Sequence, residues 1–245
     1  MDQDARRAEN SEKIIPLSME TCAGGEKIVA PIENPGREAI LSRIRAALTK
    51  PATSHPATTT GDIFFPVGDP LDRFQKECGT NNTECLLTAS LGASTAAIAE
   101  IIFALPAGPI FLQDAPILRR LAPILVTDRK VQWSTDGLPA EDSQAAITLA
   151  ETLVAATGSV FVSAACGGRG AAVVAPIHIV LAFTDQLVPD LEAAFARLYQ
   201  NGTPQQNSML VLITGSSRTA DIEKILVMGA HGPRRFVVAL SPRAE

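Results

Sequence analysis

Short apolar runs, separated by segments with helical spacing, constrain the fold of this chain more than any other feature. Short continuous runs rich in branched residues are typical of strands that are buried on both faces. The clearest runs are PIFLQ (109–113), GSVFVS (158–163), PIHIVL (176–181), MLVLI (209–213) and FVVAL (236–240). Helical spacing is found over residues 69–79, 94–105, 116–125 and 190–199. This alternation predicts an α/β fold with a mainly parallel sheet and helices on both faces.

Weaker patterns complete the expected domain. Three further short strands are expected over residues 84–88, 130–133 and 145–148. We also expect a short helix over residues 149–155. Another helix is expected over residues 221–228, where three apolar residues recur at helical spacing after two acidic ones.

The segments before this domain differ from it in composition. Residues 1–35 mix charge, Gly and Pro without a sustained period, which predicts a poorly ordered extension. Residues 36–50 form an amphipathic helix in this interpretation, and residues 51–68 form a linker rich in Pro and Thr. The α/β domain would then span residues 69–245.

Composition excludes several classes of function. The net charge of −5 and an aromatic content of 4% argue against nucleic-acid binding, and no apolar run reaches membrane-spanning length. The four cysteines stand at positions 22, 78, 85 and 166, without a CxxC pair. Iron–sulfur and zinc sites use clustered thiolates or imidazoles. We therefore expect no metal, no cofactor, and a reducing, cytoplasmic compartment.

The chemistry of the chain is concentrated after the strand at residues 209–213. Gly215 ends that strand, and the expected helix then begins near Asp221. The polar side chains between them belong to Ser216, Ser217, Arg218 and Thr219. Backbone N–H groups, hydroxyls and a guanidinium at a helix start suit a phosphate or a carboxylate. The alternative is that the hydroxyls are ordinary helix caps and the arginine is solvated.

Three more residues are candidates for the same site. His231 lies in a Gly-Pro turn of the same unit, and Arg169 is a lone charge in the glycine-rich loop 166–170. His178 lies near the start of an apolar strand, where it either positions a ligand or is a buried core histidine. Because open sheets bind ligands beyond the carboxyl ends of their strands, we group residues 215–219 with residues 158–170 at that edge.

Two stretches carry a resemblance to a known family. ITGSSRTADIEKILVMGAHGP (213–233) and PIHIVLAFTDQLVPDL (176–191) resemble the C-terminal signature of the LUD-domain family, and within it the cluster-free lactate-utilisation protein C type. The resemblance implies a fold of the class that holds ribose-phosphate isomerases, CoA transferases and folate cyclo-ligases. One departure concerns the Thr157-Gly158 step, which the family precedes with a glutamate and this chain with Ala156.

Three functions follow from these observations. The resemblance implies an accessory or substrate-handling component of L-lactate oxidation to pyruvate, which works with iron–sulfur partner proteins. An independent enzyme for a phosphorylated, CoA-linked or folate-like substrate is an alternative, and so is a module that binds an organic acid. The fold alone does not decide among them.

Overall fold

The computed structural model describes residues 35–49, 66–137, 140–166, 170–220, 226–228 and 232–243. The chain divides into two compact units, Met1–Thr60 and Gly61–Glu245. In the first unit, the expected amphipathic helix is present as α1 (Pro35–Leu48), and its apolar Ile40, Ile44 and Leu48 are exposed. The extension and the linker that we predicted lie largely outside the described residues.

In the second unit, the helices begin where the sequence provides caps. Asp69 caps α2 by accepting hydrogen bonds from the backbone N–H groups of Leu71 and Asp72, and Ser90 and Asp190 cap α3 and α6. The longer helices are α2 (Pro70–Thr80), α3 (Leu91–Phe103), α4 (Pro116–Leu125) and α6 (Leu191–Gln200), and the short ones are α5 (Gly170–Val173) and α7 (Thr203–Gln206). None of the described helices is long and apolar enough to cross a membrane.

A six-stranded parallel sheet forms the centre of this unit, as predicted, with the order β1-β12-β7-β4-β2-β3. Its strands are β1 (Thr83–Leu87), β2 (Ile110–Leu112), β3 (Val131–Trp133), β4 (Ala145–Leu149), β7 (Ile177–Phe183) and β12 (Arg235–Ser241). The last strand of the chain lies between β1 and β7, and all five pairings are parallel.

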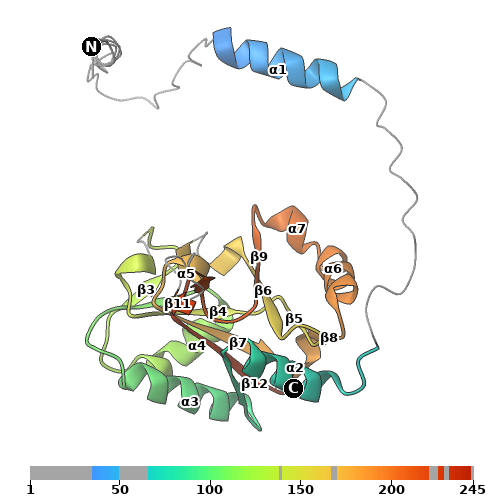
Figure 1. The fold of residues 1–245 in the computed structure, drawn as a ribbon. Helices are drawn as coiled ribbons and strands as arrows, with labels where there is room; N and C mark the ends of the chain where they lie inside the picture. Colours follow the sequence, from blue (N-terminus) through green and yellow to red (C-terminus); the bar gives the residue numbers. More distant parts are fainter. Residues whose placement is uncertain are drawn as a thin grey trace, which may run out of the picture. The chain divides into compact units, whose positions relative to one another are not determined.

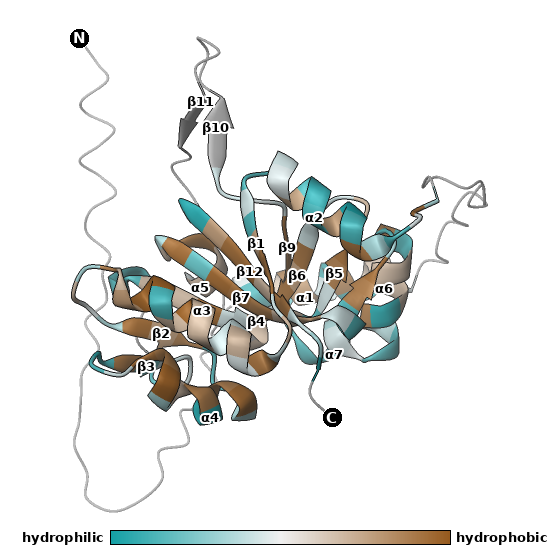
Figure 2. Cartoon of the chain, turned by 90° about the horizontal axis from the view of Figure 1, so that it is seen from below, coloured by the Kyte–Doolittle hydropathy of each residue, from teal (hydrophilic) through white to brown (hydrophobic). Residues whose placement is uncertain are grey.

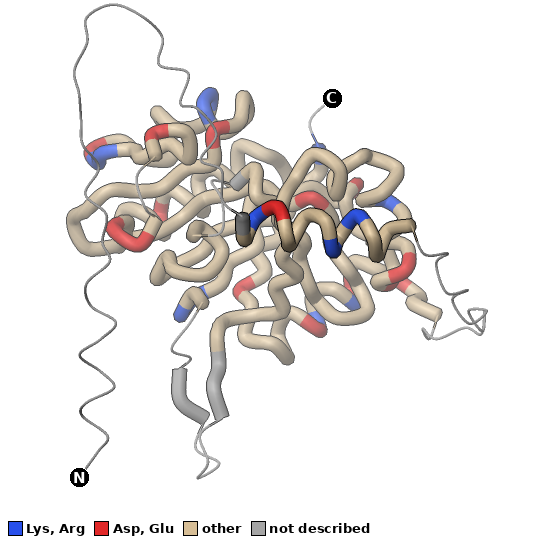
Figure 3. Tube along the Cα trace, turned by 90° about the horizontal axis from the view of Figure 1, so that it is seen from above, with Lys and Arg blue, Asp and Glu red and all other residues tan. Residues whose placement is uncertain are grey.

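The central strands β12, β7, β4 and β2 are buried on both faces, which explains why they read as apolar runs (Figure 2), whereas the edge strand β1 is partly exposed. One face packs against α3 and α4 through residues such as Ile98, Leu118 and Ile147. The other face packs against α2, α5 and a second sheet through residues such as Phe74 and Phe236. The prediction of helices on both faces is confirmed. Charged residues lie mainly on the surrounding helices and loops (Figure 3).

The second sheet corrects three expectations. It has the order β8-β5-β6-β9 and contains β5 (Thr152–Val154), β6 (Ser159–Ser163), β8 (Leu187–Val188) and β9 (Leu210–Ile213). The helix expected over residues 149–155 is wrong, because β5 pairs antiparallel with β6. The runs at residues 158–163 and 209–213 are strands of this smaller sheet and not of the parallel one. Leu212 of the edge strand β9 is 39% exposed, and α6 and α7 lie along the outer side (Figure 1).

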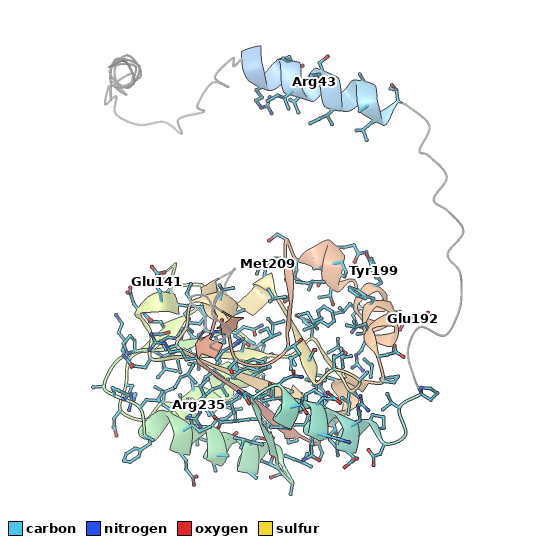
Figure 4. The ribbon with its side chains drawn as sticks, in the orientation of Figure 1. Arg43, Glu141, Glu192, Tyr199, Met209 and Arg235 are labelled. Carbon is cyan, nitrogen blue, oxygen red and sulfur yellow. The ribbon has the colours of Figure 1, made fainter. Side chains whose placement is uncertain are left out.

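The helix expected over residues 221–228 is wrong at residues 226–228, which form a strand, and residues 221–225 lie outside the described residues. Instead, β10 (Arg218–Ala220) and β11 (Leu226–Met228) pair antiparallel as a two-stranded ribbon. The branched residues of β11 fit a strand as well as a helix, and pairing across the ribbon decides between them. Past the ribbon, Arg235 begins β12 and donates two hydrogen bonds of 2.6 and 2.7 Å to the carboxylate of Glu84 on β1 (Figure 4).

Candidate ligand-binding site

An open hollow of about 460 Å³ lies where β9 ends and β12 is about to begin. Its lining combines hydroxyl and amide side chains with small apolar residues. The lining residues are Asn81, Ala172, Leu212, Ile213, Thr214, Gly215, Ser216, Ser217, Gly232 and Pro233. None of these described lining residues carries a charge. The hollow therefore offers hydrogen-bonding groups within a small and mostly uncharged space.

This hollow lies at the amino ends of the parallel strands, which corrects the expected location. Asn81 precedes β1, Ala172 precedes β7 and Pro233 precedes β12. The reason is the direction of β9, which runs antiparallel to β6 and so carries Gly215 to this edge. Of the residues 158–170 that we grouped with Gly215, Ser159 contacts Thr214 next to Gly215, but no described residue of that range lines the hollow.

Close backbone packing fixes the wall of the hollow. Gly215 has a φ of +88°, and a side chain there would place its Cβ 1.9 Å from the carbonyl oxygen of Asn81. Only glycine fits this left-handed position against the end of α2. On the opposite side, the N–H of Ser217 donates to the carbonyl oxygen of Pro233 at 2.9 Å, and the N–H of Gly232 donates to that of Val173 at 2.7 Å.

Three hydroxyl groups form a chain that ends at the hollow. The Oγ1 of Thr157 and the Oγ of Ser159 are 2.7 Å apart, and the Oγ of Ser159 is also 2.7 Å from the Oγ1 of Thr214. Ser159 is fully buried, whereas Thr214 is exposed and lines the hollow. The amide of Asn81 donates to the carbonyl oxygen of Thr157 at 3.0 Å. These bonds join α2, the β5–β6 turn and the end of β9 into one wall.

The structure brings some of the predicted site residues together and leaves others undescribed. Gly215, Ser216 and Ser217 line the hollow as one group. Arg218 and Thr219 lie on β10, and their side chains are not described. Arg169, Asp221 and His231 lie outside the described residues. The helix start expected near Asp221 lies outside the described residues, and the described residues after Gly215 lead into strand β10.

His178 is a core residue in this structure. Its ring is fully buried, lies 5.5 Å from the ring of Phe236 and has Nε2 at 2.8 Å from the Oγ1 of Thr148. Its Nδ1 has no hydrogen-bond partner among the described residues. Burial lowers the pKa of His178 to about 4, so the imidazole is neutral at neutral pH. His178 is absent from the lining of the hollow.

The family of the chain is settled by sequence comparison. The family model described as LUD domain matches residues 71–240, which is more than half of the chain. The chain belongs to the LUD-domain family. The resemblance based on residues 176–191 and 213–233 is thereby confirmed, and both stretches lie within the matched region.

Relatives of this LUD domain extend the comparison. The lactate utilization protein C of Bacillus subtilis (strain 168) is 25% identical over 226 residues, covering 80% of this chain and 92% of that protein. The protein of the same name from Geobacillus sp. (strain WCH70) is 24% identical over 206 residues, covering 78% and 85%. A crystal structure of a DUF162 family protein from Deinococcus radiodurans matches 72% of this chain and 99% of that chain, with a TM-score of 0.56 and 19% identity. At that identity it supports the fold alone.

Sequence reasoning missed several lining residues of the LUD domain, chiefly Asn81, Thr214 and Pro233. Asn81 closes α2 and is followed by Asn82, whose φ of 54° is left-handed. An Asn pair after a helix is a recognisable cap signal. Nothing in the sequence, however, indicates that this cap meets Gly215, because that contact depends on how the two sheets pack. The carboxylate of Glu151 accepts a hydrogen bond of 2.6 Å from the hydroxyl of Ser163.

Two other features of the LUD domain compete as sites and are less suitable. At the carboxyl ends of β2 and β3, Asp114 accepts bonds from Arg119 and Thr135, which hold the pKa of its carboxyl at about 2. Those charges are already paired. A hollow of about 480 Å³ lies at the ends of α3 and α4, but the Arg129 guanidinium there already bonds to carbonyl oxygens that include that of Leu105.

Two thiols of the LUD domain also interact. A hydrogen bond with Cys85, together with burial, raises the pKa of the Cys78 thiol, and the same bond lowers the pKa of Cys85. Among the described residues, no group of three or more His, Cys, Asp or Glu side chains is arranged to hold a metal ion. The hydroxyl and amide side chains that line the hollow are suited to hydrogen bonding with a small oxygen-rich molecule.

Proposed function

We propose that this LUD-domain protein is a substrate-handling component of L-lactate oxidation to pyruvate, and that it works with iron–sulfur partner proteins. Two relatives that cover most of the chain carry the name lactate utilization protein C. The four cysteines lack the paired spacing of cluster ligands, so the redox centres are assigned to the partners.

The observation that carries this proposal is the hollow at Thr214, Ser216 and Ser217. Its volume of about 460 Å³ falls in the range of small-molecule sites, and it is ample for a three-carbon acid. Hydroxyl groups both donate and accept hydrogen bonds, so they suit a ligand with a carboxylate and a second oxygen. A ligand this small gains little binding energy in total, so we expect affinities in the micromolar to millimolar range.

The binding part of the proposal is tested by titration calorimetry of the full chain with L-lactate and with pyruvate. Ser216→Leu places a large apolar side chain in the hollow and should weaken both ligands by at least about tenfold. Ser208→Leu is the matched control, because Ser208 is exposed and is not among the lining residues. Failure of the unmodified protein to bind either acid would contradict the proposal.

The partner part is tested by reconstitution. The chain is mixed with iron–sulfur proteins of lactate utilisation from the same organism, and L-lactate-dependent reduction of an electron-accepting dye is followed. We expect reduction only when the chain and the partners are both present, and a lower rate with Ser216→Leu. A full rate from the partners alone would refute a role in substrate handling.

A further inference from the structure

The three hydroxyls that lead from Thr157 through the buried Ser159 to Thr214 have a property that the other lining groups lack. Ser159 is 0% exposed and lies between two hydroxyl oxygens at 2.7 Å, one on Thr157 and one on Thr214. These distances are typical of O–H···O hydrogen bonds, so both contacts are bonded. Only the Thr214 end of the chain reaches the hollow.

Counting protons shows that this chain has two states. Each hydroxyl has one proton to donate and can accept two hydrogen bonds. If Thr157 donates to Ser159 and Ser159 donates to Thr214, the proton of Thr214 is available to the hollow. If every bond is reversed, Thr214 donates to Ser159 and presents a lone pair instead. The change needs only rotation of O–H bonds, with no movement of heavy atoms.

The described lining of the hollow does not favour either state of the three hydroxyls through a charged group. No described lining residue of the hollow is charged, so no neighbouring charge among them orients the hydroxyl of Thr214. The ligand that occupies the hollow therefore sets the direction in which the three hydroxyls donate their hydrogen bonds. A ligand oxygen that accepts a hydrogen bond requires the donating state of Thr214, whereas a ligand hydroxyl that donates is accepted in either state, because the oxygen of Thr214 can accept two bonds.

We infer that Thr214 contacts the oxygen on the second carbon of the ligand, and that the Ser159 chain lets it bind both a 2-hydroxy acid and the corresponding 2-oxo acid. This inference rests on the proposed function and assigns a residue to it. Toward L-lactate, Thr214 accepts from the hydroxyl group. Toward pyruvate, it donates to the ketone oxygen. Substrate and product are thus held by the same contact with similar affinity, as a component that handles both requires.

A competing explanation is that the three hydroxyls only fasten β6 to the end of β9. Both explanations predict some loss of stability when a hydroxyl is removed. They differ in ligand selectivity, because a purely structural contact does not distinguish acids with and without an oxygen on the second carbon. Propionate, which lacks that oxygen, is therefore the discriminating probe.

The experiment is titration calorimetry of the full chain with L-lactate, pyruvate and propionate, with circular dichroism to verify folding. Thr214→Val keeps the shape of the side chain and removes the hydroxyl. We expect it to weaken the affinity for L-lactate and for pyruvate by about tenfold each and to leave the affinity for propionate unchanged. Thr214→Ser, which keeps the hydroxyl, should bind all three acids within about threefold of the unmodified protein. Ser159→Ala should weaken the affinity for L-lactate and pyruvate severalfold and leave the affinity for propionate unchanged.

Each other result is decisive. Unchanged binding of L-lactate and pyruvate by Thr214→Val would overturn the inference and leave the proposed function intact. If Thr214→Val weakened the binding of only one of these two acids, the inference that the hydroxyl chain serves both would be overturned. If Thr214→Val bound all three acids more weakly by the same factor, the structural explanation would replace the inference. If the unmodified protein binds none of the acids, the proposed function and the inference both fail. Should Thr214→Val not fold, Thr214→Ala provides the same comparison.

Discussion

Acidification should destabilise this protein through one buried group, His178. Burial lowers the pKa of His178 from 6.5 to about 4 in the folded state, whereas the unfolded chain keeps the ordinary value. Between these two values the unfolded state binds a proton that the folded state excludes. Stability therefore falls as the pH drops from about 6.5 to about 4, and this group contributes no further loss below that window.

The size of the effect follows from the same two pKa values. Each pH unit between them corresponds to about 1.4 kcal/mol, so the full window lowers the free energy of unfolding by about 3 kcal/mol. That is a large fraction of the stability of an ordinary domain. The Nε2 bond to Thr148 does not oppose the effect, because a neutral imidazole already makes it.

Urea unfolding at several pH values measures this contribution. His178→Gln removes the ionisable group, so its stability should fall less than that of the unmodified protein between about pH 6.5 and about pH 4. The difference between the two proteins isolates His178 from carboxylates that titrate in the same range. His55→Gln, in the expected linker, is the matched histidine control and should behave as the unmodified protein does. If acidification lowered the free energy of unfolding equally in the unmodified protein and in His178→Gln, a neutral, buried His178 would be refuted.

Two further substitutions test the packing described above. Gly215→Ala should lower the free energy of unfolding by more than about 2 kcal/mol, because the new side chain adds left-handed backbone strain and a clash with the Asn81 carbonyl. Gly79→Ala is the control: this position in α2 has open space, so the change should be neutral or stabilising by up to about 1 kcal/mol. Denaturant unfolding compares the two, and equal losses would contradict the close approach at Gly215. Asp69→Ala should remove about 1 kcal/mol with the α2 cap, seen as a lower thermal midpoint in calorimetry; an unchanged midpoint would show that the cap is not needed.

The central architecture could be predicted from sequence because local pattern and burial agree there. The apolar runs of β7 and β12 are continuous, and both strands are buried on both faces, so periodicity and packing indicate the same element. The predictions failed where pairing outweighs local spacing. Residues 152–154 and 226–228 belong to stretches with apolar residues at helical intervals, yet they form strands, because a partner strand is supplied nearby in sequence. The Thr157-Gly158 turn, with Gly158 at a φ of +62°, is a hairpin signal that identifies β5 in retrospect.

The candidate site was predicted in part for a similar reason. Gly215, Ser216 and Ser217 were found because their residue types carry the signal locally. Asn81 and Pro233 could not be found, because their role depends on contacts between segments far apart in the chain. The expected edge of the sheet was wrong for the same cause. The rule for parallel sheets places ligands at carboxyl ends, but these hydroxyls follow a strand of the smaller sheet, which the rule does not cover.

The place of β12 has a consequence for how the protein is made. Within the described residues, β1 pairs with β12 alone in the main sheet, and the two strands are separated by about 150 residues of sequence. During synthesis, β1 leaves the ribosome long before β12 has been made, and β7 has one unpaired edge until β12 is added. The hollow at Gly232 and Pro233 is completed by the same last segment. Folding of residues 232–241 is therefore the step at which the parallel sheet closes and the wall of the hollow is completed. Until then, the open strand edges of the nascent chain are those that a chaperone would need to cover.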